Sequence, residues 1–537
     1  MEFMLVVVLL WTTIFVFLST LVYRWIFSSK DQQVPRGPSA LPIIGHLHLL
    51  GPNLHRSFHQ LSLHYGPLLH LRLGSVPCVV ASTPELAREF LKTNELSFSS
   101  RKLTPAIKLV TYDASFAFAP YGPFWKFIKK LATQELLGST NLRNFEKIRK
   151  MEVHAFLSDL MRKAKVGEEV NVTEEIMNLA NNIISQMMFS LRCSDGESDQ
   201  AQQARTVIRE VTEIFGEFDV SDIIGFGGSL DLQGIRKRAK NIHTRYDTLL
   251  EKIISDREIL RSAKRLQNRE DGGSNEANDF LDMLLDTMEN QTSEVKVTRN
   301  NIKAVILDFF TAATDTTPIA IEWALVELIN NPRVLEKAQE EINKVVEGNH
   351  RLAEESDTPH LPYIQAIIKE TLRLHPPIPM LIRKSVNECN VAGSKIPAHA
   401  LLFVNIWSIG RNEKYWDNPL EFRPERFLEP NGDGDPSRIR DIKGHHFELL
   451  PFGTGRRGCP GMSLAILELP NILALILQCF DFEVPALHAG KTEGAVLDMA
   501  ERPGLTAPRA NDLICRLKSR IDHPLNILSS PQSRDMS

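Results

Sequence analysis

The chain has 537 residues and a mass of 60.7 kDa, with 62 Lys and Arg against 66 Asp and Glu, so its formal net charge is −4. This near balance argues against a protein that binds nucleic acid. Hydrophobic residues make up 43% and charged residues 24%, a globular composition that excludes disordered and collagen-like classes. Length alone predicts roughly three or four domains.

The first predicted element is an apolar segment, residues 3–23, that carries no charged side chain. As a helix it would be about 30 Å long, which matches the hydrocarbon core of a bilayer. The alternative is a signal peptide, but the segment is longer than such an h-region and lacks a small-x-small cleavage site. Glu2 precedes it and Arg24 and Lys30 follow it, so the positive-inside rule places the rest in the cytosol. We predict a membrane anchor over residues 1–30.

Cysteine spacing is the next constraint. The six cysteines, at positions 78, 193, 389, 459, 479 and 515, are never closer than 20 residues apart. This spacing encodes neither a CxxC metal site nor a compact disulfide framework. A reducing, cytosolic setting fits it.

Residues 31–52 are proline-rich, which excludes a continuous helix and predicts a stiff linker. From about residue 54 to 80 the pattern indicates short strands. Most of the chain from there to about residue 385 has the 3.6-residue apolar period of helices. The chain is therefore predicted to be mainly helical with a minor sheet.

Later segments contain fewer helices. Residues 262–279 are polar and contain Gly, which predicts an exposed loop between two helices. Residues 391–404 indicate a second strand region. Residues 412–458 form a meander rich in Pro, Asn and Gly, and residues 521–537 are expected to be a frayed tail.

The most informative segment reads PFGTGRRGCPG, residues 451–461, and an apolar helix is predicted to follow it to about Phe480. Its glycines allow the backbone to approach a flat, bulky group. A cysteine near a helix N-terminus and beside Arg456 and Arg457 favours the thiolate, the form that ligates a metal. A lone cysteine is more often a buried, inert residue, but this setting favours a ligand role for Cys459.

This segment resembles the ligand loop of the haem-thiolate monooxygenases, or cytochromes P-450, whose pattern is Phe-Gly-x-Gly-x-Arg-x-Cys-x-Gly. Every fixed position of the pattern is matched, by Phe452, Gly453, Gly455, Arg457, Cys459 and Gly461. The resemblance implies a single large fold, mainly α with minor β sheets, over residues 53–520. It also implies haem b with Cys459 as the axial ligand of the iron, O2, and electrons from NADPH through a partner reductase.

Two further motifs follow the family order. Glu370 and Arg373, in KETLRLHPP, are neighbours on one helix face. Pairs with this spacing also arise by chance on protein surfaces, but this one precedes a segment that resembles the PERF element of the family. By that resemblance Arg426 completes a buried ion network with the pair.

A predicted helix over residues 301–330 contains Ala-Ala-Thr-Asp-Thr-Thr, which resembles the oxygen-binding turn of the family. The resemblance implies that Asp315 and Thr316 relay protons toward bound dioxygen. Ala313 stands where the family usually has Gly. Pro318 removes a backbone N–H, so either the helix kinks or packing absorbs the loss.

The resemblance also predicts residues that hold the haem. Trp125 and Lys129 fit a Trp-x-x-x-Arg pattern with Lys in place of Arg, and Lys can still pair with a propionate as a point charge. Arg383 and Arg457 align with further propionate partners.

Within the family, DFFTAATDTT, ETLRLHPPIPMLIRKS, LLFVNIWSIGRN and ERPGLTAPRA resemble the plant flavonoid branch, closest to flavone synthase II. That resemblance implies C2–C3 desaturation of flavanones in the endoplasmic reticulum membrane. Alternatives are a flavanone 2-hydroxylase or an isoflavonoid-type oxidase, and more remotely a haem-binding protein without turnover. The implied substrate pocket is mostly apolar with a few hydroxyls: Phe118, Phe310, Ala313, Thr314, Thr317, Ile378, Leu381, Leu505 and Thr506.

Overall fold

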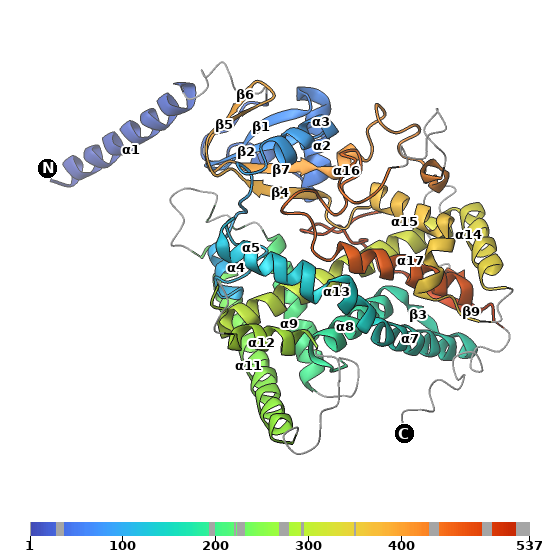
Figure 1. Cartoon of the computed structure of the whole chain (residues 1–537). Coiled ribbons are helices and arrows are strands. Elements are labelled where there is room, and N and C mark those ends of the chain that lie inside the picture. The colour runs from blue at the N-terminus through green and yellow to red at the C-terminus, as the bar shows by residue number, and fades with distance from the viewer. Residues whose placement is uncertain are drawn as a thin grey trace. The chain divides into compact units, whose positions relative to one another are not determined.

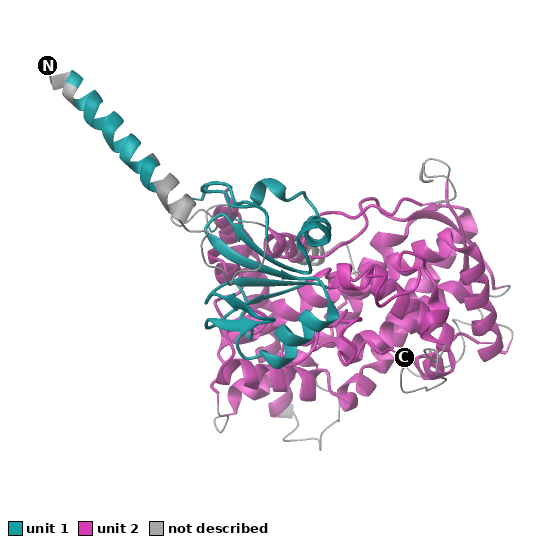
Figure 2. Cartoon of the chain, turned by 90° about the horizontal axis from the view of Figure 1, so that it is seen from above, with its two compact units in different colours: residues 1–102, 219–233, 381–405 teal, residues 103–218, 234–380, 406–537 magenta. Residues whose placement is uncertain are grey.

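The structure is a computed structural model that describes residues 2–27, 37–192, 199–217, 219, 222, 231–267, 279–290, 295–347, 351–428, 440–485 and 497–521. Helices dominate it and the strands form small sheets (Figure 1). The chain divides into two compact units (Figure 2). Unit 1 comprises residues 1–102, 219–233 and 381–405, and unit 2 comprises residues 103–218, 234–380 and 406–537.

The N-terminal helix α1 (Glu2–Phe27) contains the whole predicted anchor segment. Its described apolar side chains are exposed, with Trp11 at 67% and Phe15 at 71%. Among the described residues, two helices are long and apolar enough to cross a membrane by length and composition, α13 (Arg299–Asn330) and α17 (Met462–Cys479), and Val6–Phe17 of α1 is a shorter apolar stretch. Both are mostly buried within the protein, which is typical of core helices.

Unit 1 is built on a sheet with strand order β1 (Leu68–Leu73), β2 (Val76–Ala81), β7 (Leu401–Asn405) and β4 (Met380–Lys384). The hairpin β1–β2 is antiparallel and pairs Leu71 with Cys78, whereas β2 and β7 are parallel. A second hairpin joins β5 (Cys389–Val391) and β6 (Ser394–Ile396). The remaining elements are short: η1 (Leu47–Leu49), α2 (Leu54–Tyr65), α3 (Pro84–Arg88) and the π-turn η2 (Glu89–Thr93).

The sequence interpretation of residues 54–80 was wrong over its first half. Residues 54–65 form helix α2, and the strands begin only at Leu68. The apolar residues Leu54, Phe58 and Leu61 are spaced at helical intervals, and Phe58 is fully buried against Phe403, with 5.3 Å between ring centroids.

Unit 2 is mainly helical, and its core surrounds α13. This helix contacts α8, α15 and α17 and is buried around most of its circumference. It begins at a capping box between Thr298 and Asn301 and runs without interruption through Pro318. The other helices of unit 2 are α4 (Pro105–Val110), α5 (Pro123–Lys130), η3 (Leu131–Leu136), α6 (Ser139–Asn144), α7 (Glu146–Val166), α8 (Val172–Phe189), α9 (Asp199–Gly216), α11 (Ile235–Gln267), α12 (Phe280–Glu289), α14 (Pro332–Val345), η4 (Glu355–His360), α15 (Pro362–Leu374), α16 (Ile406–Ile409) and η5 (Pro424–Phe427).

A small sheet in unit 2 has strand order β3 (Glu169–Asn171), β9 (Ile514–Ser519) and β8 (Phe480–Glu483). The mainly helical class with minor sheets that the sequence predicted is therefore confirmed. The predicted helix at 462–480 is α17, and the strand region at 391–404 is distributed over β5, β6 and β7.

Other expectations need correction or fall outside the described residues. The predicted loop at 262–279 begins too early, because α11 continues to Gln267; residues 268–278 are not described. The described part of the linker is tied to β1, since the His46 N–H donates to the Arg72 carbonyl at 2.7 Å. In the described part of the 412–458 meander the one regular element is η5. The predicted tail, apart from Ile521, is not described.

Candidate active site

The loop that carries Cys459 has a fixed backbone. Gly453 and Gly455 adopt φ values of 66° and 67°, the left-handed region that disfavours side chains. The Cys459 N–H donates to the Phe452 carbonyl at 2.9 Å, and the Gly458 N–H donates to the Gly455 carbonyl at 3.0 Å. Cys459 is exposed, and α17 begins just after it at Met462. The backbone therefore presents the thiol outward at the start of an apolar helix.

Basic side chains hold this loop. The Lys129 ammonium of α5 donates to the Gly458 carbonyl at 2.6 Å. The Arg457 guanidinium lies 4.5 Å from the ring centroid of buried Trp125, also on α5. Three of the predicted haem-binding residues thus gather at the Cys459 loop. Arg383 lies in β4 of unit 1, where its guanidinium donates to the Ile382 carbonyl at 2.9 Å.

Glu370, Arg373 and Arg426 form one buried ion network. Arg373 donates twice to Glu370, at 2.7 Å each, and Arg426 Nε donates to the same carboxylate at 2.9 Å. Arg373 also donates to the carbonyls of Gly410 and Pro419. The network therefore joins α15 to the meander that leads to the ligand loop.

Two glycines in this region were missed by sequence reasoning. A Cβ added to Gly410 would lie 2.4 Å from the Arg373 carbonyl oxygen, and one added to Gly444 would lie 2.7 Å from the Gly453 carbonyl oxygen. Gly444 also accepts a hydrogen bond from Thr454 through its carbonyl, at 2.8 Å. Only a residue without a side chain permits these approaches, and no local sequence signal distinguishes such glycines from those of ordinary turns.

The predicted oxygen-binding turn lies in the middle of α13. Ala312 is exposed although most of this helix is buried. The Thr316 hydroxyl donates to the Ala312 carbonyl at 2.8 Å, so it lies on the same face. Burial raises the pKa of Asp315, an effect that the Thr506 hydroxyl and the Arg502 guanidinium partly offset. Asp315 Oδ2 is buried without a hydrogen-bond partner among the described residues.

The predicted pocket residues on α13 do not share the exposed face of Ala312. Ala313 and Thr317 line a small cavity toward α8 and α17. The Thr314 hydroxyl is buried and donates to the Phe310 carbonyl at 2.8 Å, and the Phe310 ring stacks on Phe189 of α8.

The other predicted pocket residues of unit 2 come together. Phe118 makes an edge contact with Phe215 near the end of α9, with 5.1 Å between ring centroids. The Ala507 N–H donates to the Pro377 carbonyl at 2.9 Å, which joins the segment of Leu505 and Thr506 to that of Ile378. A Cβ at Gly216 would lie 2.8 Å from the Leu505 nitrogen. Leu381 lies in unit 1.

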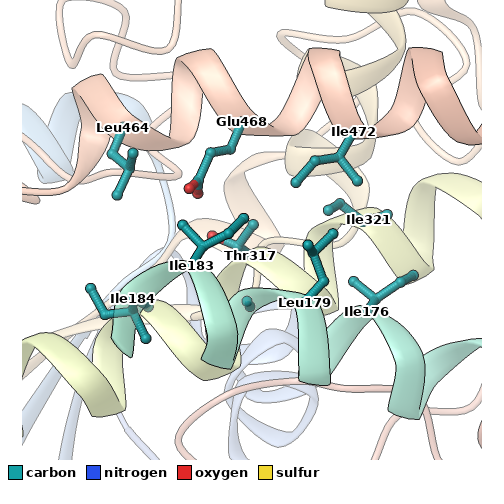
Figure 3. A pocket seen from close by; sticks show the side chains of 11 residues that line it. Ile176, Leu179, Ile183, Ile184, Thr317, Ile321, Leu464, Glu468 and Ile472 are labelled. Carbon is teal, nitrogen blue, oxygen red and sulfur yellow. The ribbon is translucent and has the colours of Figure 1, made fainter. Parts of the chain in front are cut away.

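The cavity beside α13 contains a buried acid that sequence reasoning did not single out. Figure 3 shows Glu468 pointing from α17 into the space between α8 and α13, where Thr317 and Ile183 also lie. The cavity has a volume of about 10 Å³, close to the smallest that holds one water molecule. Burial raises the pKa of Glu468 to about 8, with the positive charge of Arg149 opposing and Glu355 adding to the shift.

Replacing Glu468 by Gln should stabilise the protein at alkaline pH. The pKa of the acid is higher in the folded state, so the free energy of unfolding falls as pH rises from about 4.5 to about 8. The Gln side chain does not titrate, so the free energy of unfolding of the variant does not fall in this way. The advantage of the variant should therefore grow by on the order of 4 kcal/mol between these limits. Chemical denaturation at both pH values measures it; an advantage independent of pH would contradict the assignment.

The residues around Cys459 fit a haem. Cys459 supplies an exposed sulfur ligand, glycines keep the adjoining backbone free of side chains, and cationic side chains gather there. The structure also leaves Ala312 exposed on a mostly buried helix. A haem held by Cys459 would supply the redox chemistry of dioxygen activation.

Comparisons with known proteins agree with this geometry. The family model described as cytochrome P450 matches residues 35–502. The chain is 58% identical to cytochrome P450 93B2 of Gerbera hybrida, over 93% of this chain and 95% of that protein. It is 56% identical to cytochrome P450 93B16 of Glycine max, over 94% and 96%. It is 45% identical to a 2-hydroxyisoflavanone synthase of Glycyrrhiza uralensis, over 91% and 92%.

A solved structure extends the comparison to the fold. A zebra fish cytochrome P450 determined with abiraterone superposes with a TM-score of 0.68 at 26% identity, and the match covers 87% of this chain and 99% of the other. Proteins of this family are oxidoreductases that use haem, O2 and electrons that a partner reductase takes from NADPH. Because the family model and the relatives span nearly the whole chain, this protein belongs to the cytochrome P450 family.

Proposed function

We propose that this protein converts flavanones into flavones by forming the C2–C3 double bond. The observation that carries the proposal is the acid–alcohol turn of α13, where Thr316 lies on the exposed face with Ala312 and Asp315 is a buried acid with a raised pKa. The turn occurs in the Ala-Ala-Thr-Asp-Thr-Thr form that resembles the flavone-forming type.

A second candidate is hydroxylation. Relatives named 2-hydroxyisoflavanone synthase and 3,9-dihydroxypterocarpan 6A-monooxygenase are 45% identical to this chain. Both candidates begin with removal of a hydrogen from the substrate. They differ in whether a second hydrogen is lost or oxygen is transferred, and that difference depends on small displacements of the substrate.

The chain supplies binding, orientation and proton transfer. Cys459 would hold the iron, and the Lys129 and Arg457 cations would neutralise the haem propionates. Trp125 supports the ligand loop by lying against the Arg457 guanidinium. Thr316 and Asp315 hold and pass protons at the oxygen-binding turn, because a buried acid with a raised pKa keeps its proton nearer neutral pH. The aromatic residues Phe118 and Phe215 exclude water from one side of the substrate.

The cellular setting is part of the proposal. Helix α1 anchors the chain in the endoplasmic reticulum membrane as a single span, with the catalytic part (53–520) in the cytosol and the linker (31–52) between them. The partners are an NADPH–cytochrome reductase, membrane lipid and a flavanone.

Microsomes that contain the protein, a reductase and NADPH test the function. A supplied flavanone should give a product lighter by two hydrogens. A product that has gained one oxygen would support the hydroxylase, and no conversion of any flavanone would reject the proposed substrate class.

Replacing Thr316 by Ala should lower the ratio of product formed to NADPH consumed by about tenfold. This loss is smaller than the full effect of general acid catalysis, because water can replace the hydroxyl as a proton donor. Thr311→Ala is the matched control, since the Thr311 hydroxyl lies on the same helix but is buried and donates to the Leu307 carbonyl at 2.8 Å. The ratio of product to NADPH consumed measures the effect. Equal coupling in both variants would remove the relay role from Thr316.

A further inference from the structure

A short segment between α4 and α5, residues 111–119, forms what we call the wall segment, and it carries Phe118. It is irregular and half-buried, and its middle, Ala114 to Phe116, is buried. Tyr112 and Asp113 adopt positive φ values of 58° and 54°, which is unfavourable for residues with side chains. Internal hydrogen bonds close only part of it, for example from the Ala119 N–H to the Ser115 carbonyl at 2.9 Å. Such a segment keeps one conformation only if its surroundings hold it.

Asp308 of α13 holds the wall segment on one side. Its carboxylate accepts a hydrogen bond from the Ser115 hydroxyl at 2.6 Å and a longer one from the Ala117 N–H at 3.4 Å. Asp308 is 6% exposed and Ser115 is 3% exposed. A buried carboxylate destabilises a protein unless donors surround it, so packing alone does not explain an Asp here.

The ligand loop holds the same segment on another side. The Arg457 guanidinium donates to the Phe116 carbonyl at 3.3 Å and also to the Ala119 carbonyl. Arg457 is only two residues before Cys459. The wall segment therefore bridges the oxygen helix and the loop of the predicted haem ligand.

Asp308 also lies on the relevant face of α13. Residues 308, 312 and 316 are spaced four apart and so form one stripe. The stripe contains exposed Ala312 and the predicted proton donor Thr316. Two aromatic rings of the wall segment lie near the residues held by Asp308 and Arg457. The Phe116 and Phe309 ring centroids are 6.3 Å apart, and those of Phe118 and Phe215 are 5.1 Å apart. A shift of the Asp308 contact would move these rings relative to the stripe.

We propose that Asp308 is a positioning residue that fixes the wall segment through Ser115 and Ala117, and so determines where the substrate lies along the 308–312–316 stripe. This inference rests on the proposed function in one respect: it predicts the ratio of desaturated to hydroxylated flavanone product. The anchoring itself does not depend on the identity of the substrate.

The hydrogen-bonding groups of Asp308 and Ser115 determine which variants test the contact. Asp308→Ala removes both acceptors. Asp308→Asn can keep the geometry, because the amide oxygen accepts from Ala117 while the NH2 group donates to Ser115, whose hydroxyl also accepts. Adding Ser115→Ala to Asp308→Asn removes that acceptor. Asp279→Ala is the control, since it breaks a comparable Ser–Asp contact of 2.8 Å, with Ser190, at the N-terminus of α12.

Hydrogen exchange of the wall-segment amides, in the holoenzyme without substrate, is the first measurement. Asp308→Ala should raise exchange at Ala117 and Ala119 by about tenfold, the loss expected for one or two hydrogen bonds. Asp308→Asn should remain near the wild type. The double variant keeps the acceptor for Ala117 but loses the Ser115 contact, so its exchange should lie between those of Asp308→Asn and Asp308→Ala. Unchanged exchange in Asp308→Ala would overturn the anchoring.

Product analysis is the second measurement. Asp308→Ala should lower the ratio of desaturated to hydroxylated product several-fold, with recovery in Asp308→Asn, while Asp279→Ala lowers stability and leaves the ratio unchanged. An equal ratio in Asp308→Ala and Asp279→Ala would overturn the positioning role. If the wild type converts no flavanone, the proposed function fails, and the exchange measurement still supports or overturns the anchoring.

Discussion

Replacing Glu370 by Gln should prevent the protein from accumulating in a folded, haem-loaded form. Glu370 is fully buried and accepts hydrogen bonds from both Arg373 and Arg426. Without its charge, Arg373, which is 1% exposed, becomes a buried cation whose described partners are all neutral: carbonyl oxygens, the substituted amide and the Trp416 ring. Breaking a buried pair in this way destabilises by about 3–5 kcal/mol, a large fraction of the stability of a typical protein.

The yield of soluble holoprotein and the midpoint of thermal unfolding measure this effect. Arg162→Gln is the matched control, because it removes an ion pair with the same three-residue spacing, to Asp159, that lies at the surface. The control should leave the midpoint almost unchanged. If Glu370→Gln behaved like the control, the network would not be the structural support described here.

Replacing Cys459 by Ser should abolish the thiolate-haem spectrum of the reduced, carbon monoxide-bound protein and reduce turnover to background. The described cysteines divide clearly by environment. Burial raises the pKa of Cys479 and Cys515 to about 12, so these thiols remain protonated and inert. Cys459 is instead exposed beside Arg457, at the start of α17.

Cys389→Ser is the matched control for this variant, because Cys389 is partly exposed in the β5–β6 hairpin of unit 1. It should keep the spectrum and the activity. Loss of the spectrum in Cys389→Ser, or its retention in Cys459→Ser, would reject Cys459 as the ligand.

Most of the fold class could be predicted from the sequence, because the periodicity of apolar residues along the chain distinguishes helices from strands. Helices α13 and α17 and the strand region around β7 have patterns that few alternatives fit. The error at α2 arose where apolar residues at helical spacing lay next to a true strand pattern. The two-unit division could not be predicted, since strands β2 and β7 are far apart in sequence yet pair directly.

The candidate site shows the same limit. The Cys459 loop and the Glu370–Arg373 pair are local motifs, so their residues could be named in advance. The Ser115–Asp308 contact spans 193 residues and has no local signature. Helix α13 is apolar on nearly every face, so its sequence pattern alone does not show which face lines a pocket.

The most direct test of the proposed activity is the mass of the first product formed from a flavanone under heavy-isotope-labelled dioxygen. Microsomes with the wild-type protein, reductase and NADPH would be sampled at early times. We predict a flavone that is lighter than the substrate by two hydrogens and contains no labelled oxygen. An early product that carries one labelled oxygen atom would contradict direct desaturation and establish hydroxylation instead.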